Sequence, residues 1–377
     1  YRGDIVIYLD YSATTPVNED VLNTYVLTTK QYIGNPNSLH KLGFEAKKLI
    51  DAATNQVASI LKVNPNEIIY TSGSSESNNL AIKGICAKHT GKHIITTELE
   101  HSSVSETVKY MQSLGYDVSY VKLDSNGLVD LIDLEKIIRE DTVLVSVSAV
   151  NSEVGVVQDI EAIGRVVKRH PKVFFHSDMT QCIGKMKVDL SMVDLASVSA
   201  QKFYGMKGIG CLIKKNKIDI EPLIHGGKST TVFRAGTPAT PLIASFSKAL
   251  RLAYQDFEVK NEHVVQLHKY LINKLKDLNI EVNSNEFCLP YIVNVSLPGI
   301  KPETMLHALE QEEIYISTQT ACSTGNYSLA VLAVTNDIVK ASHSIRISLS
   351  YLTTFDELDK FISVFAKKID ELSSLVH

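Results

Sequence analysis

Short runs of β-branched and apolar residues alternate with longer helical stretches, and this alternation constrains the fold more than any other feature. The strands that we expect are residues 93–98, 118–123, 142–150, 172–178, 195–200 and 208–214. The helices that we expect are residues 46–61, 102–115 and 160–170. Apolar strands that alternate with helices are typical of a mostly parallel sheet covered by helices on both faces. We therefore predict an α/β fold.

The pattern changes from about residue 260, which indicates a second, smaller domain. The elements expected there are a helix over 257–278, a strand over 291–297, a helix after residues 301–305, a strand over 343–350 and a final amphipathic helix. This order is typical of an α+β domain. A chain of 377 residues, 44% of them hydrophobic, is long enough for about two domains. We predict a large domain over 15–255 and a small one formed by 1–14 and 256–377.

Composition excludes several classes of protein. The net charge of −4 argues against a nucleic acid or an anionic membrane surface as the main partner. No apolar run is long enough to span a bilayer, and the start of the chain lacks the layout of a signal peptide. Five cysteines occur without CxxC spacing, which indicates reduced thiols in a cytoplasmic protein and neither a disulfide framework nor a metal site. Four of them are expected in or near the core: Cys86, Cys182, Cys211 and Cys288.

Three stretches place polar residues where predicted strands end, which is where ligands bind in open α/β sheets. In 70–84, a Gly-Ser-Ser turn opens a helix, and its free N–H groups with Ser74 and Ser75 suit an anion such as phosphate. Ordinary helix capping explains these serines equally well. Asp178 ends an apolar strand, where it is either a helix cap or a fixed negative charge. Lys202 follows another strand and could form a Schiff base, although a surface lysine is the simpler alternative.

These three signals become specific only in combination. A phosphate cradle, a carboxylate and a lysine, all at strand ends, match the needs of one cofactor, pyridoxal phosphate. Its aldehyde needs a lysine, its ring nitrogen needs an anion, and its phosphate suits a helix N-terminus. Lys207 follows in the same stretch as a competing lysine, and it is the more ordinary of the two.

Cys322 stands apart from the other cysteines, in the segment TQTACSTGN of residues 318–326. A structural cysteine usually has apolar neighbours, and a zinc-binding cysteine usually has a second ligand two to four residues away. Cys322 has neither, because its neighbours are small and polar. The composition predicts a thiol that is presented on a flexible segment instead of packed in the core.

Motifs spread along nearly the whole chain resemble those of the NifS/IscS-type cysteine desulfurases, in class V of the fold-type-I pyridoxal-phosphate enzymes. They are YLDYSATTP, GNPNSLH, TSGSSESNNLAIKG, ELEHSSV, EVGVVQDI, HSDMTQCIGK, SAQKFYGMKGIG, RAGTP, TACS and HSIRISL. The resemblance implies a homodimer that binds pyridoxal phosphate and converts L-cysteine to L-alanine. It also implies that the sulfur passes through a persulfide to an acceptor protein.

The resemblance further implies a role for each matching position. Lys202, His101 and Cys322 would be catalytic: Lys202 holds the cofactor covalently, His101 stacks on its ring, and Cys322 takes the sulfur. Asn35 and Arg346 would grip the substrate carboxylate. The remaining cofactor contacts fall on the ring nitrogen (Asp178), the ring hydroxyl (Gln181 and Ser152) and the phosphate (Ser74, Ser75, Ser199, Gln201 and, in the partner subunit's site, Thr237).

The chain departs from the family pattern at four places, and the first is YLDYSATTP, in which Tyr11 and Ser12 stand where the family has asparagine and alanine. Gln201 stands where the family has histidine, so this side chain can donate to a phosphate but brings no positive charge. Ser152 stands where a second asparagine is usual, and residues 227–233 lack the family's usual character. None of these departures removes a residue expected to form a covalent bond.

Other functions fit parts of the pattern. A selenocysteine lyase or another class V enzyme, such as an aminotransferase, would share the cofactor residues, but an aminotransferase has no use for a mobile thiol. A sulfur-transfer scaffold without turnover is a rival of another class, and the complete set of chemical residues argues against it. Iron–sulfur cluster assembly, tRNA thiolation and thiamine synthesis all stay open as the pathway.

Overall fold

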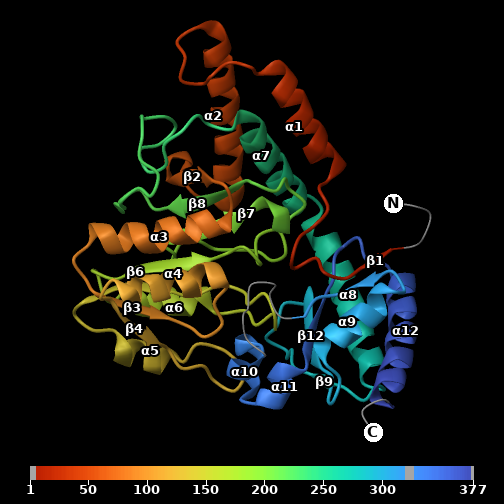
Figure 1. The fold of residues 1–377 in the computed structure, drawn as a ribbon. Helices are drawn as coiled ribbons and strands as arrows, with labels where there is room; N and C mark the ends of the chain where they lie inside the picture. The colour runs from red at the N-terminus through yellow and green to blue at the C-terminus, as the bar shows by residue number, and fades with distance from the viewer. Residues whose placement is uncertain (1–5, 319–326, 375–377) are drawn as a thin grey trace.

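The computed structural model describes residues 6–318 and 327–374, and a seven-stranded sheet lies at its centre (Figure 1). In spatial order its strands are β2 (Ile68–Thr71), β8 (Gly210–Lys214), β7 (Leu195–Ser199), β6 (Phe174–Asp178), β5 (Thr142–Ser146), β3 (His93–Thr96) and β4 (Asp117–Tyr120). β8 runs antiparallel to both of its neighbours, and the other pairs are parallel. The predicted mostly parallel sheet is confirmed, and all six predicted strands belong to it.

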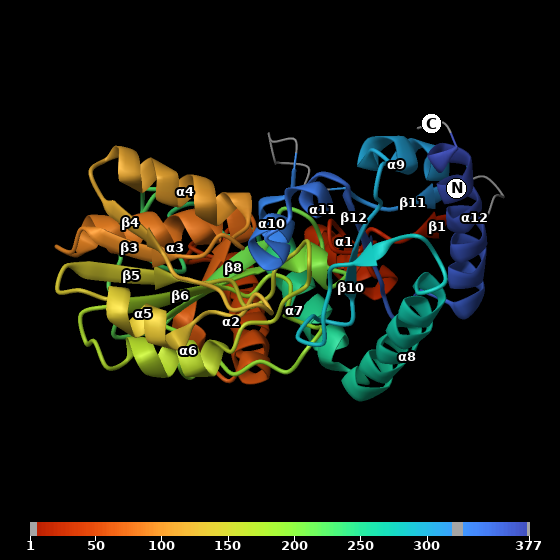
Figure 2. The same ribbon diagram turned by 90° about the horizontal axis from the view of Figure 1, so that it is seen from below.

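Helices cover both faces of this sheet (Figure 2). On one face lie α3 (Ser74–Lys88) and α4 (Ser102–Ser113). On the other lie α2 (Lys41–Leu61), α5 (Leu131–Ile137), α6 (Ile160–Val167) and α7 (Thr240–Tyr254), while α1 (Glu19–Gln31) packs against α7. The residues of β3, β5, β7 and β8 are all buried, as expected for strands covered on both sides.

The C-terminal part of the chain forms a smaller antiparallel sheet of β9 (Glu281–Val282), β10 (Ile292–Ser296) and β12 (Ser344–Ser348). Around it lie α8 (Phe257–Leu275), α9 (Pro302–Glu310), α10 (Leu329–Thr335), α11 (Ile338–Ser342) and α12 (Phe355–Ser373). Near the start of the chain, β1 (Ile7–Tyr8) pairs in parallel with β11 (Ile314–Tyr315). The N-terminal segment therefore lies with the C-terminal part, although the exact domain boundaries stay a prediction.

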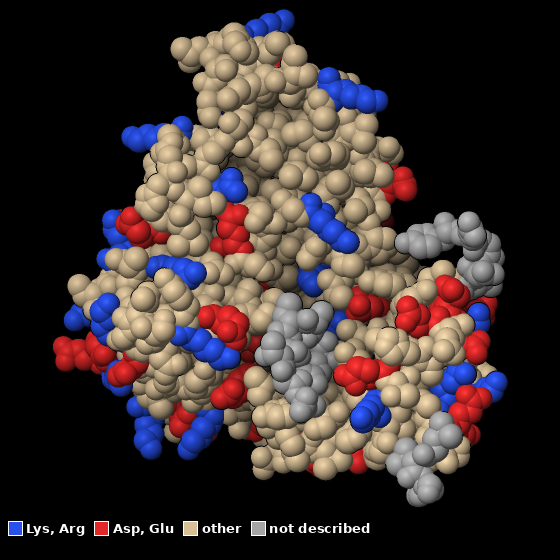
Figure 3. All heavy atoms as spheres, viewed as in Figure 1, with Lys and Arg blue, Asp and Glu red and all other residues tan. Residues whose placement is uncertain are grey.

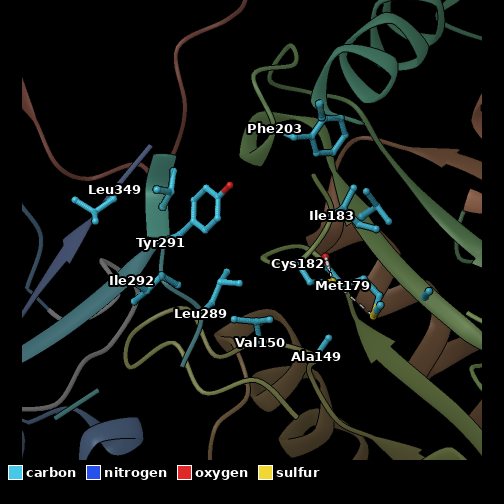
Figure 4. Packing of buried hydrophobic residues seen from close by; sticks show 14 of the residues in the cluster. Ala149, Val150, Met179, Cys182, Ile183, Phe203, Leu289, Tyr291, Ile292 and Leu349 are labelled. Carbon is cyan, nitrogen blue, oxygen red and sulfur yellow. Dashed lines mark hydrogen bonds between the residues drawn. The ribbon is translucent and has the colours of Figure 1, made fainter. Parts of the chain in front are cut away.

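A continuous apolar cluster joins the two parts (Figure 4). Val150, Cys182 and Phe203 come from segments that follow strands of the large sheet, whereas Leu289 and Tyr291 come from the segment that enters β10. All five side chains are buried. Close-packed interiors are hardly compressible, so this cluster can hold side chains from the two parts at fixed distances from each other.

The four described cysteines, Cys86, Cys182, Cys211 and Cys288, are buried and unpaired. Burial raises the pKa of Cys86 and of Cys211 to about 12, so neither thiol is reactive near neutral pH. Among the helices described, none has the length and apolar character that crossing a bilayer requires.

Candidate active site

A cavity of about 290 Å³ opens where the carboxyl edge of the large sheet meets the C-terminal part. It is lined by Asp10, Ser12, Ala13, Ser74, Ser75, Leu99, His101, Ser148, Val150, Ser152, Asp178, Thr180, Gln181, Gln201, Lys202, Ser317 and Arg346. This edge collects the side chains because parallel strands all end there. Ser74 follows β2, His101 follows β3, Asp178 ends β6, and Lys202 follows β7.

Lys202 lies in the short 3₁₀ turn Ala200–Lys202 that follows β7. Its Nζ donates to the carbonyl oxygens of Ser12 and Ala13, at 2.7 Å each. Burial and the nearby Arg346 guanidinium lower the pKa of Lys202 to about 8, while Asp178 acts in the opposite direction. An appreciable fraction of the amine is therefore neutral near physiological pH, the state that a nucleophilic or basic lysine needs.

Asp178 is buried at the end of β6, and two donors hold its carboxylate in place. Oδ1 accepts from the backbone N–H of Thr180 at 3.0 Å, and Oδ2 accepts from Asn78 Nδ2 at 2.8 Å. Donors to both oxygens favour the ionised form. The arrangement supplies a fixed negative charge next to the cavity.

His101 caps the N-terminus of α4. Its Nδ1 accepts from the backbone N–H of Ser103 at 3.1 Å and lies 2.8 Å from Ser103 Oγ. Burial is the main reason that the pKa of the imidazole lies below its usual range. His101 is therefore mostly neutral near pH 7, with Nδ1 committed to the protein.

Gln181 is held at both ends of its amide. Nε2 donates to the carbonyl of Ser12 at 3.0 Å, and Oε1 accepts from Lys185 Nζ at 2.8 Å. Lys185 is itself buried, and burial together with the charge of Lys202 lowers its pKa to about 7. The Ser12 carbonyl fixes which end of the amide is the donor, because a carbonyl oxygen only accepts hydrogen bonds.

The first turn of α3 brings Ser74 and Ser75 to the cavity, beside Gln201. Gly73 precedes the helix with φ of +151°, a conformation that residues with a Cβ rarely adopt. A Cβ at Gly73 would make only an ordinary contact, 3.5 Å from Ser199 Oγ, so the backbone conformation is what favours glycine. This conformation turns the chain into α3, and the first N–H groups of the helix form a place for an anion.

Arg346 enters the cavity from β12 of the C-terminal part and is buried. Nη2 forms an ion pair with Asp10 Oδ1 at 2.7 Å, and Nη1 donates to the carbonyl of Ser152 at 2.9 Å. Within the described residues, Nε has no hydrogen-bond partner. The guanidinium can therefore still donate to a ligand, and a carboxylate is its natural acceptor.

Several predicted site residues do not line the cavity. Asn35 is exposed in the α1–α2 connection, Thr237 is exposed before α7, and Ser199 is buried behind Gly73. Cys322 lies outside the described residues. The roles of these four residues stay predictions.

The cavity residues fit pyridoxal phosphate on their own chemistry. They supply a lysine amine with a lowered pKa, an ionised carboxylate and a helix N-terminus with two serine hydroxyls. In addition, two lining hydroxyls, Ser12 Oγ and Thr180 Oγ1, are buried without a partner among the described residues. Buried polar atoms usually have partners, so these groups indicate a missing polar ligand.

Comparisons with known proteins agree with this site. Residues 7–361 match the family model described as aminotransferase class-V. Cysteine desulfurase IscS of Vibrio cholerae is 39% identical over 98% of this chain and 94% of its own length. The mitochondrial cysteine desulfurase of Candida maltosa is 38% identical over 99% of this chain and 79% of its own length. The chain belongs to the cysteine desulfurases of the class V family. Among solved structures, a NifS-like protein superimposes with a TM-score of 0.91 at 37% identity, covering 98% of this chain and all of that one.

Family membership confirms the predicted fold class, enzyme class and cofactor, pyridoxal phosphate. The sequence interpretation missed five residues that shape the cavity: Asp10, Ser12, Asn78, Ser103 and Lys185. All five stand inside motifs that carried the resemblance. The partners of Asp10, Ser12 and Asn78 lie at least 100 positions away in the sequence, so no local pattern revealed them. Ser103 and Lys185 contact His101 and Gln181, which are two and four positions away.

Proposed function

We propose that this cysteine desulfurase converts L-cysteine to L-alanine and keeps the sulfur as a persulfide on Cys322 before passing it to an acceptor protein. One observation carries the proposal. The partly buried amine of Lys202, the carboxylate of Asp178 and the guanidinium of Arg346 line the same cavity. An amino-acid substrate that reacts at its α-carbon needs all three, for the cofactor's carbonyl, its ring nitrogen and the substrate carboxylate.

Pyridoxal phosphate, when bound, supplies an electron sink for bond cleavage at the substrate. Lys202 would hold it covalently, Asp178 would pair with its ring nitrogen, and His101 would stack on its ring. Gln181, supported by Ser152, would donate to the ring hydroxyl oxygen. The phosphate would lie on the first turn of α3, with contacts from Ser74, Ser75, Ser199 and Gln201.

The protein's own groups then position the substrate and move its protons. Arg346, helped by Asn35, would bind the substrate carboxylate, because its Nε has no other partner among the described residues. Lys202, with its pKa lowered to about 8, can take a proton from the substrate α-carbon and return one. The Ser12 and Ala13 carbonyls that accept from Nζ hold the amine at the cavity.

Cys322 would act as the nucleophile, in the thiolate form that attacks sulfur. Its Sγ bonds to the substrate sulfur, the substrate C–S bond breaks, and that electron pair ends in a C–H bond of alanine. One L-cysteine and one protein thiol thus become one L-alanine and one persulfide. Ser317, five residues before Cys322, lines the cavity and exchanges backbone hydrogen bonds with Arg346.

A homodimer is part of the proposal. Exposed apolar side chains gather on α1, α2 and the segment before α7, where the visible surface in Figure 3 is mostly uncharged. They are Leu22, Val26, Leu27, Ile33, Leu39, Leu42, Phe44, Leu223, Ile224 and Val232. Large exposed apolar patches mark interaction surfaces. Thr237 is exposed near this patch, where its hydroxyl would reach the cofactor phosphate in the partner subunit's site. Sedimentation velocity would test whether the protein is a dimer.

The acceptor protein belongs to a pathway for sulfur-containing cofactors, such as iron–sulfur clusters, or for tRNA thiolation. Over the rest of the face shown in Figure 3, acidic and basic side chains are interspersed, which suits a protein acceptor better than direct contact with a nucleic acid. We also propose a cytoplasmic location, supported by the unpaired thiols of the four described cysteines. Capture of mixed disulfides at Cys322 under non-reducing conditions would identify the acceptor.

The proposal is tested by exposing the cofactor-loaded protein briefly to L-cysteine without a reductant. We expect alanine to form and the peptide that contains Cys322 to gain the mass of one sulfur atom. Cys322→Ser should bind cofactor normally and produce no alanine, because a serine hydroxyl is a far poorer nucleophile than a thiolate. Full alanine production by Cys322→Ser, or sulfur found on Cys86 or Cys288 instead, would overturn the proposal.

A further inference from the structure

A chain of hydrogen bonds joins Asp178 to His101 through two side chains that have no assigned role, Asn78 and Ser103. Asn78 lies in α3 and is fully buried. Its Nδ2 donates to Asp178 Oδ2 at 2.8 Å and to Ser103 Oγ at 2.8 Å. Ser103 Oγ lies 2.8 Å from His101 Nδ1, which also accepts the backbone N–H of Ser103 at 3.1 Å.

The direction of every bond in this chain follows from chemistry. An ionised carboxylate only accepts, so the amide nitrogen of Asn78 must face Asp178. The second N–H of that nitrogen donates to Ser103 Oγ, so the proton of the serine hydroxyl can point at His101. His101 Nδ1 therefore faces two donors and must present its lone pair.

We propose that Asn78 and Ser103 are positioning residues that hold His101 in the neutral tautomer with its proton on Nε2. The ring then offers an N–H donor to the cavity, because Nδ1 is committed to Ser103. A donor at this place favours a negatively charged substrate atom, such as a thiolate sulfur, over its protonated form. The inference rests on the proposed site, in which His101 lies beside the reacting groups.

The same chain opposes protonation of His101. A proton on Nδ1 would meet the O–H and the N–H of Ser103, so the imidazolium would lose two hydrogen bonds. The charged groups that bear on the ring are Asp178 and Glu153, which favour protonation, and Lys202, which opposes it. The hydrogen bonds from Ser103 therefore also oppose protonation of His101, and the hydroxyl can be removed without changing any of these charges.

Nitrogen-15 NMR of the cofactor-free protein with labelled histidine tests the proposal directly. The chain has 12 histidines, and the signal that His101→Gln removes identifies His101. We expect Nε2 to have the shift of a protonated nitrogen and Nδ1 that of a bare one. In Ser103→Ala the neutral imidazole loses one hydrogen bond, so the pKa of His101 should rise by roughly half to one unit.

Matched variants separate positioning from a general effect on the fold. Ser103→Thr keeps the hydroxyl and should titrate like the parent. Ser113→Ala removes a hydroxyl that donates to Tyr110 near the other end of α4, and it should leave the His101 signals unchanged. Asn78→Leu should reproduce part of the Ser103→Ala shift, because the serine hydroxyl would lose the donor that orients it.

A proton on Nδ1 in the parent protein would overturn the proposal, even if Ser103→Ala failed to fold. An unchanged His101 titration in Ser103→Ala would overturn it as well. Neither result depends on turnover, so failure here is distinguishable from failure of the desulfurase assay.

Discussion

His176 is fully buried and His101 is partly buried, and the ring nitrogens of the two residues have different hydrogen-bond partners. His176 lies inside the sheet on β6, where Nδ1 is 2.8 Å from Ser146 Oγ on β5 and Nε2 is 3.0 Å from Ser197 Oγ on β7. His101 lies at the carboxyl edge, where Nδ1 is bonded to Ser103 and its ring lines the cavity. The first imidazole cross-links three strands, whereas the second keeps one nitrogen available.

The difference shows how this sheet separates stability from chemistry. Between the strands, His93 repeats the arrangement of His176, with one ring nitrogen bonded to Thr142 and the other to Ser119. At the edge, Arg346 Nε lacks a partner among the described residues, and Lys202 rests on backbone carbonyls that a ligand could replace. We therefore expect changes at the edge to alter activity and changes between strands to alter stability.

The largest expected effect is on the edge side of this comparison. Lys202→Ala should lower alanine production by at least about 100-fold, the lower end of what a positioned acid–base group contributes. Its thermal unfolding midpoint should shift by only a few degrees. Activity assays and calorimetry on Lys202→Ala and on the exposed Lys207→Ala measure both quantities. Cofactor trapped on Lys207 by borohydride, or equal losses in the two variants, would contradict the assignment.

The second largest effect concerns His176, between the strands, and it is a change of stability with pH. Burial lowers the pKa of His176 to about 4, against roughly 6.5 in an unfolded chain. The folded state therefore binds fewer protons between these values, so the contribution of His176 to stability is complete above pH 6.5. It is lost as the pH falls toward 4. The loss should be roughly 3 kcal/mol.

Urea unfolding of the parent and of His176→Gln at pH 7 and pH 4 isolates this contribution, because glutamine keeps hydrogen-bonding groups but does not titrate. The variant should lose less stability than the parent on acidification. The exposed His307→Gln is the matched control and should behave like the parent. If the free energy of unfolding falls equally in the parent and in His176→Gln between pH 7 and pH 4, His176 is not the source of the acid sensitivity.

The smallest effect should come from Gln201, whose identity departs from the family pattern. Gln201→His should tighten pyridoxal-phosphate binding by about 1 kcal/mol, the difference between a charge-assisted and a neutral hydrogen bond. The gain should fade as the pH rises above the imidazole pKa, because only the charged ring strengthens the bond. Cofactor titrations at two pH values measure it, and an equal affinity at both would show that Gln201 does not reach the phosphate.

Much of the fold was predictable from local patterns, since apolar runs and amphipathic periods are properties of consecutive residues. The six predicted strands all entered the large sheet, and the helix predicted over 257–278 is α8. Short elements escaped prediction: β1, β9 and β11 have two residues each and are defined by their partners, not by their own sequences.

For the site, the sequence by itself determined the candidate residues, because Lys202, Asp178 and His101 stand in motifs at strand ends, and the structure brings all three to one cavity. Only the tertiary structure decided how they are held. The Ser12 carbonyl orients Gln181, Asp10 pairs with Arg346, and Asn78 joins Asp178 to Ser103. Asp10 and Arg346 are 336 positions apart in the sequence, and Asn78 and Asp178 are 100 positions apart. Contacts of that range depend on how the strands and helices pack in three dimensions, which no local pattern records.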